Sequence, residues 1–226
     1  MDDVMLSYLL LFVSLFLVII AQAFVSGAYA RYKKIKNNRG LSGLDVARQI
    51  LDKHGLQDVY VTETQGNLSD HYDPTRKVVR LSKDIYHGTS IASVSVAAHE
   101  VGHAIQDKDG YTFMRIRSKL VPLVNFSSSA GYFAILIGFF FGWLQLIWIG
   151  IFLEVIILLF QLITLPVELD ASKRAKQELE SNGMLDSNEL KKSSRMLKAA
   201  AFTYVASVLT TLLQIARLIL MARNKD

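Results

Sequence analysis

The chain of 226 residues contains no cysteine. Any metal ion that it binds must therefore be held by nitrogen and oxygen ligands, and cysteine usage indicates nothing about the redox compartment. Charged residues are also scarce, at 20%, whereas hydrophobic residues make up 51% and occur in long blocks. This split composition is typical of a membrane protein with a small soluble part. The net charge of +5 is modest, and no nucleic-acid partner is expected.

The first apolar block, residues 5–24, is long enough to cross a bilayer as a helix. Two A-x-A patterns, at 21–23 near the end of this block and at 28–30 after it, resemble the cleavage site of a signal peptide. The flanking charges argue against cleavage, because the residues before the block are acidic and residues 31–39 are basic. The positive-inside rule then predicts an uncleaved anchor with its N-terminus outside and the following segment in the cytoplasm.

Two further apolar stretches follow the soluble part. Residues 120–166 are long enough to cross twice, with a turn at 141–145, and residues 199–221 predict a fourth crossing. Glu154 lies in the third crossing, where a carboxylate needs a partner such as Gln214 or Arg217. Both termini are then expected outside, with the basic segment 168–198 in the cytoplasm.

These patterns predict five segments, which are a transmembrane anchor, a soluble subdomain, a transmembrane hairpin, a polar helical segment and a last transmembrane helix. Their ranges are 1–30, 31–118, 119–167, 168–198 and 199–226. The predicted fold is a mostly α-helical integral membrane protein with about four transmembrane helices and a small α+β core.

The soluble subdomain shows helix and strand patterns in turn. A helix begins at Ser42 or Asp45 and stops before Gly55. Strands are predicted at 59–62, 68–72 and 77–81, and a turn at 73–76 suggests a short antiparallel sheet. A second helix covers 91–105, capped by Thr89 or Ser90. At this length, with charged residues on both sides, this helix does not cross the membrane.

The helix at 91–105 contains the sequence His99-Glu100-Val101-Gly102-His103, an H-E-x-x-H pattern. Residues four apart lie on one face of a helix, so both imidazoles face the same point, as zinc requires. Glu100 is offset around the helix, where it can reach a water on the metal. The alternative is two surface histidines beside a salt-bridged glutamate.

A catalytic zinc ion needs a third protein ligand. Glu168 is the candidate by position, because it is the first carboxylate after the membrane hairpin and lies on the cytoplasmic side. On position alone, a solvated juxtamembrane glutamate is an equally good interpretation.

Three stretches of the chain are distinctive, namely residues 69–74 (SDHYDP), 97–106 (AAHEVGHAIQ) and 165–172 (LPVELDAS). Together they resemble the YugP-type bacterial membrane zinc metallopeptidases. The likeness spans nearly the whole chain, and that family is distantly similar to HtpX-type membrane proteases and other gluzincins. The resemblance implies a zincin-like core in which His99, His103 and Glu168 hold one Zn²⁺ ion and Glu100 is the base. Many gluzincins carry an aspartate four residues after the ligand glutamate; here that position is Ser172, and Asp170 is the acid predicted to orient a histidine.

The tetrahedral intermediate of peptide hydrolysis needs a second electrophile. His71 is the preferred candidate, with Tyr72 and His87 as alternatives. The predicted function is a zinc-dependent endopeptidase in a bacterial cell membrane, with its active site on the cytoplasmic side, that cleaves membrane or membrane-proximal proteins. The alternative is a non-catalytic, zinc-stabilised membrane scaffold or chaperone-like protein, although an intact Glu100 argues against it.

Overall fold

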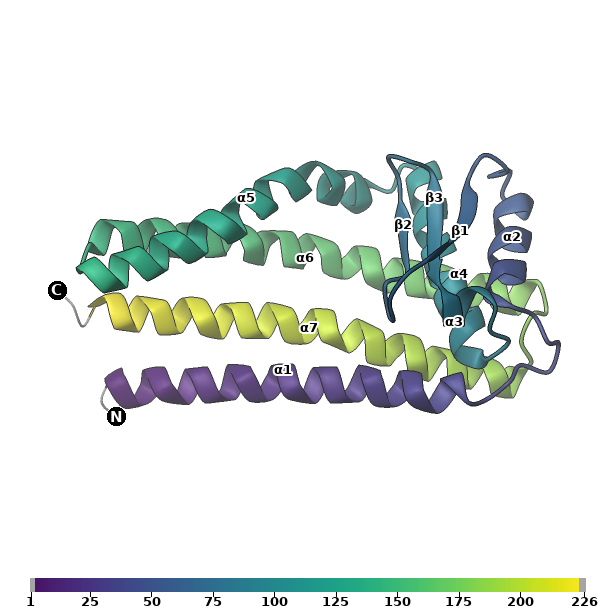
Figure 1. Cartoon of the computed structure of the whole chain (residues 1–226), viewed down its shortest axis with the longest axis horizontal. Helices are drawn as coiled ribbons and strands as arrows, with labels where there is room; N and C mark the ends of the chain where they lie inside the picture. The colour runs from purple at the N-terminus through teal and green to yellow at the C-terminus, as the bar shows by residue number, and fades with distance from the viewer. Residues whose placement is uncertain (1–2, 224–226) are drawn as a thin grey trace. The chain divides into compact units, whose positions relative to one another are not determined.

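The structure is a computed structural model that describes residues 3–223. Residues 1–2 and 224–226, at the outer ends of the predicted first and last membrane segments, lie outside the described residues. Helices predominate, which confirms the mostly α-helical class (Figure 1). In chain order the elements are α1 (Asp3–Lys33), α2 (Gly43–Lys53), β1 (Tyr60–Thr64), β2 (His71–Asp73), β3 (Val78–Ser82), α3 (Lys83–Tyr86), α4 (Ile91–Lys108), α5 (Thr112–Phe141), α6 (Leu144–Ser181) and α7 (Ser187–Arg223).

Four helices, α1, α5, α6 and α7, are long and apolar enough to cross a membrane. The chain divides into two compact units. The apolar unit comprises Met1–Ala23, Ile116–Leu165 and Phe202–Asp226, and the polar unit comprises Phe24–Arg115 and Pro166–Ala201.

In the apolar unit, α5 and α6 are joined by a short turn in which Gly142 has a φ of +70°. Glycines allow the two helices to approach closely beside this turn. A Cβ at Gly138 would lie 2.7 Å from Cγ1 of Ile147, and one at Gly131 would lie 3.2 Å from Cβ of Leu153. Small residues therefore serve helix packing here, as is common between membrane helices.

Glu154 lines a cavity of about 210 Å³ in the apolar unit, together with Gln214 and Arg217. The structure thus places the predicted partners around the same space. Among residues 3–223, no hydrogen bond or ion pair joins Glu154 to either of them.

In the polar unit, α2 begins at a capping box formed by Ser42 and Asp45. The Ser42 hydroxyl accepts from the Asp45 amide, and the Asp45 carboxylate accepts from the Ser42 amide, which satisfies two donors that a helix start leaves free. Val46, Ile50 and Leu51 are fully buried on one face of α2 and join the core of this unit. The helix packs against α4 through this face.

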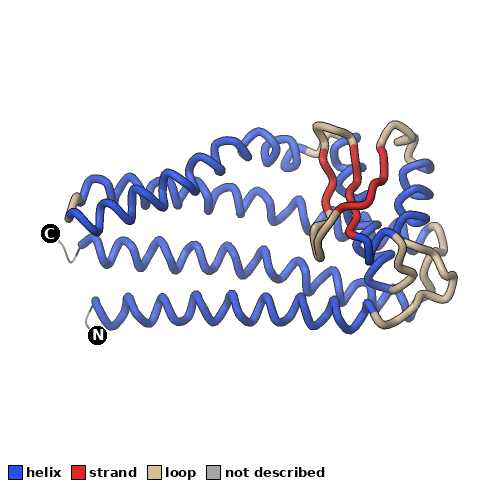
Figure 2. The backbone as a smooth tube through the Cα atoms, in the orientation of Figure 1, coloured by secondary structure: helices blue, strands red, loops and turns tan. Residues whose placement is uncertain are grey.

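The three strands form a mixed sheet in the order β1-β3-β2 (Figure 2). The predicted turn joins β2 and β3 as an antiparallel pair, and Asp73 accepts from the amides of Thr75 and Arg76 in it. The expected all-antiparallel arrangement is wrong for β1, which pairs with β3 in parallel. Strand β3 is buried along almost its whole length and takes the central place, whereas β1 exposes Tyr60 at the edge. Because the chain reverses between β1 and β2 and again between β2 and β3, β1 runs parallel to this central strand.

Helix α4 begins after Ser90, whose hydroxyl accepts from the Ser93 amide at 3.0 Å. Almost every side chain of α4 is buried, as expected for a helix that is apolar on most sides. At Gly102, α4 approaches α6 so closely that a Cβ would lie 2.7 Å from the backbone oxygen of Ala171. This contact brings the H-E-x-x-H helix against the segment that contains Glu168.

Candidate metal centre

Three potential metal ligands converge between α4 and α6 within the polar unit. The imidazoles of His99 and His103 lie one helical turn apart on α4, with ring centroids separated by 4.8 Å. Oε2 of Glu168 on α6 lies 3.2 Å from Nε2 of His99 and 3.5 Å from Nε2 of His103. One ligand atom from each residue lies within 4.8 Å of the others. The structure thus brings together the three residues that the family resemblance implies as ligands.

The two distances from Glu168 to the imidazole nitrogens fit a small tetrahedral ion. Ligand atoms bound about 2.0–2.1 Å from a tetrahedral zinc lie roughly 3.4 Å from one another. The two His–Glu distances of 3.2 and 3.5 Å bracket that value. Two imidazoles and one carboxylate are also the ligand set of many catalytic zinc sites.

The protonation of His103 can be derived from its neighbour Gln106. The amide nitrogen of Gln106 donates to the backbone oxygen of Val167 at 2.8 Å and to the Asp170 carboxylate at 2.9 Å. Because two acceptors fix the nitrogen, the amide oxygen is the atom that faces Nδ1 of His103, at 2.9 Å. Nδ1 therefore carries a proton, and Nε2 is the ring nitrogen left to bind a metal ion.

This Nε2 atom lies 3.5 Å from the Glu168 carboxylate oxygen. Both side chains are largely buried, with 7% and 3% exposed. A buried carboxylate beside imidazole nitrogens is stabilised by a cation, either a proton on a ring or a metal ion. The arrangement therefore fits a bound metal ion, and His103, His99 and Glu168 are the residues able to hold it.

Further polar contacts hold the Gln106 amide in the orientation that faces His103. Asp170 accepts from both Gln106 and Nε of Arg174, and the Arg174 guanidinium also donates to Asp109 at 2.6 Å. Among residues 3–223, no hydrogen bond joins Asp170 to either imidazole. Asp170, predicted to orient a histidine, is placed to act on His103 through Gln106.

His99 has a different support. Its Nδ1 lies 3.2 Å from the hydroxyl of Ser172, four residues after Glu168 on α6. A hydroxyl accepts as readily as it donates, so this contact permits a proton on Nδ1 and a lone pair on Nε2. Ser172 thus occupies the place where many gluzincins carry an aspartate.

Glu100 is buried beside the cluster, on α4. Burial raises the pKa of its carboxyl to about 7, and the nearby carboxylates of Glu168 and Asp70 contribute to the rise. The backbone amide of Tyr72 donates to Glu100 and opposes this rise. A carboxyl with a pKa near neutrality can take up and release a proton during a reaction.

The other sequence candidates lie outside the cluster. His71 is exposed on β2, and its Nδ1 donates to the backbone oxygen of Ser69 at 2.8 Å. Tyr72 donates its hydroxyl to Asp107 at 3.0 Å, and burial raises the pKa of this phenol. His87 pairs with Glu63 at an exposed position. Among residues 3–223, no hydrogen bond or ion pair joins these three side chains to the two histidines or Glu168.

Gln106 contacts His103, and its role at the metal centre is not predicted from the sequence. A signal for it exists, because it follows His103 by three residues and so lies on the same face of α4. Its other two partners, Val167 and Asp170, lie more than sixty residues further along the chain, so these hydrogen bonds cannot be predicted from local sequence.

The chain matches known sequences over nearly its whole length. A family model described as "Putative neutral zinc metallopeptidase" matches residues 7–223. A protein of Bacillus subtilis (strain 168) named "Putative membrane protease YugP" is 46% identical over 204 residues, which cover 90% of this chain and 91% of that protein. No solved structure matches the chain.

Proposed function

The chain belongs to this family of neutral zinc metallopeptidases, and from that membership we propose that it is a gluzincin-like endopeptidase that cleaves membrane or membrane-proximal proteins. The family match also confirms the resemblance that its sequence motifs indicate. The observation that carries the proposal is the convergence of His99, His103 and Glu168 beside a buried glutamate of raised pKa.

His99, His103 and Glu168 would hold one Zn²⁺ ion in this site. Bound zinc supplies Lewis acidity, which polarises a peptide carbonyl and lowers the pKa of a water molecule to roughly 7. Gln106 and Ser172 hold the two rings with their Nε2 atoms toward Glu168. The ligand geometry is therefore prepared by the protein before a substrate binds.

Glu100 is the proposed general base. It would accept a proton from the attacking water and then pass that proton to the leaving amine. Burial raises the pKa of this carboxyl, which makes it a better proton acceptor than an exposed glutamate. The amide of Tyr72 would hold the carboxylate in place.

The edge of strand β2 is the proposed substrate-binding element. Strand β2 is at the end of the sheet, and the backbone of its Tyr72 lies close to Glu100. An extended peptide can add to such an edge through backbone hydrogen bonds, which tolerates many sequences. His71 lies on this strand, where a bound peptide would bring its oxyanion within reach.

The proposed location is a bacterial cell membrane, with the metal centre on the cytoplasmic side and both ends of the chain outside. The support is the charge pattern, because basic residues follow the first apolar block and precede the last one. Reporter fusions after Lys36 and after Arg223 should therefore lie on opposite sides of the membrane.

The proposal can be tested with Glu100→Gln in the purified, zinc-loaded protein. Zinc content should be unchanged, and the cleavage rate of a casein-like protein should fall by about 10²- to 10⁴-fold, because the proton acceptor is lost. Glu63→Gln, at an exposed glutamate outside the cluster, is the matched control. Equal cleavage by Glu100→Gln and the unaltered protein would refute the mechanism.

A zinc-stabilised scaffold or chaperone-like protein is the alternative that this experiment separates. In that case the unaltered protein would bind zinc but cleave neither casein nor a membrane protein. A structural site has no need of a base, so Glu100→Gln would then change neither zinc content nor stability.

A further inference from the structure

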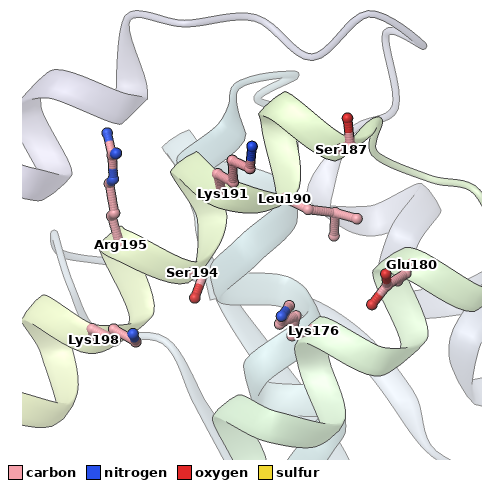
Figure 3. Close-up of a pocket in the computed structure, with 8 residues that line it drawn as sticks. All are labelled: Lys176, Glu180, Ser187, Leu190, Lys191, Ser194, Arg195 and Lys198. Atoms are coloured by element: carbon pink, nitrogen blue, oxygen red, sulfur yellow. The ribbon is translucent and has the colours of Figure 1, made fainter.

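A groove in the polar unit lies apart from the metal centre and shares no residue with it. It has a volume of about 410 Å³ and runs between the last part of α6 and the first part of α7 (Figure 3). Its lining residues are Lys176, Glu180, Ser187, Leu190, Lys191, Ser194, Arg195 and Lys198.

The groove residues of α7 occur at helical spacing. The six positions from Ser187 to Lys198 recur every three or four residues, so they form one continuous face of α7. Lys176 and Glu180 lie one turn apart on α6 and form the other wall, as Figure 3 shows. Leu190 is buried, so the groove has an apolar contact at its base.

The charge of the groove is strongly positive. Four cations, Lys176, Lys191, Arg195 and Lys198, face one carboxylate, that of Glu180. Within residues 3–223, none of the four cations forms an ion pair or a side-chain hydrogen bond. Elsewhere in the polar unit, cations such as Lys53 and Arg174 are paired with carboxylates.

Unpaired ammonium and guanidinium groups beside two hydroxyls form a donor set for phosphate. An arginine fork binds two phosphate oxygens at once, and lysines add point charges around it. The serine hydroxyls of Ser187 and Ser194 can donate to the remaining oxygens.

The position of the groove in the chain favours a phosphate that belongs to a lipid. Lys198 is followed directly by the apolar run 199–221, which predicts the start of a membrane crossing. Basic residues at this position meet the headgroup layer, where anionic phospholipids concentrate. The positive-inside rule alone would account for the number of these cations, but it requires no common helix face and no groove.

We propose that the groove between α6 and α7 binds the headgroup phosphate of an anionic phospholipid. The site holds the phosphate between Arg195 and the three lysines, and it favours anionic headgroups over zwitterionic ones because a choline cation would be repelled. It is independent of the metal centre, and zinc binding does not test it.

The experiment uses the full chain, purified in detergent, and counts bound lipids by native mass spectrometry. Phosphatidylglycerol is the anionic probe and phosphatidylcholine the zwitterionic one. The unaltered protein should bind phosphatidylglycerol more tightly. A charged hydrogen bond to the phosphate contributes at least about fivefold in affinity, so Lys191→Gln with Arg195→Gln should weaken phosphatidylglycerol binding by about 30-fold or more.

The matched control is Lys34→Gln with Lys36→Gln, which removes the same charge from two exposed lysines just after α1. This pair should leave phosphatidylglycerol affinity within about twofold of its original value, because it lies outside the groove. Equal losses in both double variants would show general electrostatic attraction and overturn the proposal. If the groove variant does not fold, Lys176→Gln on the other wall replaces it, with an expected loss of about fivefold or more.

Two competitors distinguish the source of the phosphate. Glycerol 3-phosphate, which has no acyl chains, should displace phosphatidylglycerol only weakly. If it displaces the lipid at equal concentration, the groove binds a soluble phosphate and the proposal of a lipid site is wrong. A polyglutamate peptide should not compete, and competition by it would instead identify an acidic protein segment.

Discussion

The two imidazoles of the metal centre lie one turn apart on the same helix, yet the protein holds them differently. The His103 side chain is 7% exposed, and its Nδ1 bonds to an amide that two further acceptors fix in place. The His99 side chain is 16% exposed, and its Nδ1 contacts a single hydroxyl at 3.2 Å. A hydroxyl rotates freely about its C–O bond, whereas the Gln106 amide cannot turn without losing both of its donor bonds.

The difference shows that identical ligands in one motif need not be equally prepared for metal. His103 has one tautomer imposed by the fold, so it is the fixed ligand. His99 can change its tautomer with a small rotation of Ser172, so it is the adjustable ligand. Variants that act on each support separately can measure how large this difference is.

The largest effect is expected from removing either imidazole. His99→Ala and His103→Ala should each abolish stoichiometric zinc binding, because two remaining protein ligands do not hold the ion. Metal analysis of the purified protein, equilibrated in a chelator-buffered zinc solution, measures this. His54→Ala, at a histidine paired with Glu178, should retain zinc. Full zinc in one of the two ligand variants would show that the centre depends on a different ligand set.

Gln106→Leu should have the next largest effect. It removes the acceptor of His103 and leaves its Nδ1–H buried without a partner, so zinc affinity should fall about 10- to 100-fold. Competition with a chelator of known affinity provides the measurement. Ser95→Ala is a suitable control, since Ser95 is a buried polar residue of α4 that bonds to Ser193. Similar losses in both variants would show that any buried polar deletion weakens the site.

Ser172→Ala should cost less, no more than about tenfold in zinc affinity, because water can replace a hydroxyl at a partly exposed ring. Ser172→Asp should instead strengthen zinc binding, since a carboxylate fixes the Nδ1–H tautomer of His99. The same chelator competition measures both. A loss in Ser172→Ala as large as that in Gln106→Leu would remove the distinction between the two histidines.

The smallest effect is expected at the outer end of the polar chain. Arg174→Met removes the guanidinium that pairs with Asp170 and Asp109 but leaves the Gln106 bonds intact. Zinc affinity should change less than threefold, and the free energy of unfolding should fall by about 1 kcal/mol or less, as for partly exposed ion pairs. Thermal unfolding measures the stability. A large loss of zinc would show that Asp170 controls His103 more directly than the contacts indicate.

The sequence predicts the helices well because their signals are local. Ser90 and the apolar pattern after it define α4, and Ser42 with Asp45 defines the start of α2. The order of the strands cannot be predicted from local sequence, because it depends on which strand is most buried in the folded chain. Burial of β3 places it between the other two strands, and after two reversals of the chain β1 then pairs with it in parallel.

The same distinction applies to the metal centre. The spacing of His99 and His103 shows their convergence, because a helix imposes it. Glu168 is 69 positions from His99, and only position and resemblance indicate it before folding. The roles of Gln106 and Ser172 depend on contacts between α4 and α6, so the chain has to be folded before they become visible.

Gly102 determines how closely α4 and α6 approach each other beside the metal centre. A Cβ there would lie 2.7 Å from the Ala171 oxygen, and ordinary contact begins near 3.4 Å, so a methyl group would force the helices roughly 0.7 Å apart. Metal–ligand distances in working sites vary by only about 0.2 Å. The glycine at the fourth position of the motif therefore permits the close approach of α4 to α6 on which the ligand spacing depends. A designed protein that contains this H-E-x-x-H helix therefore needs a second helix whose backbone lies as close to the glycine as Ala171 does here.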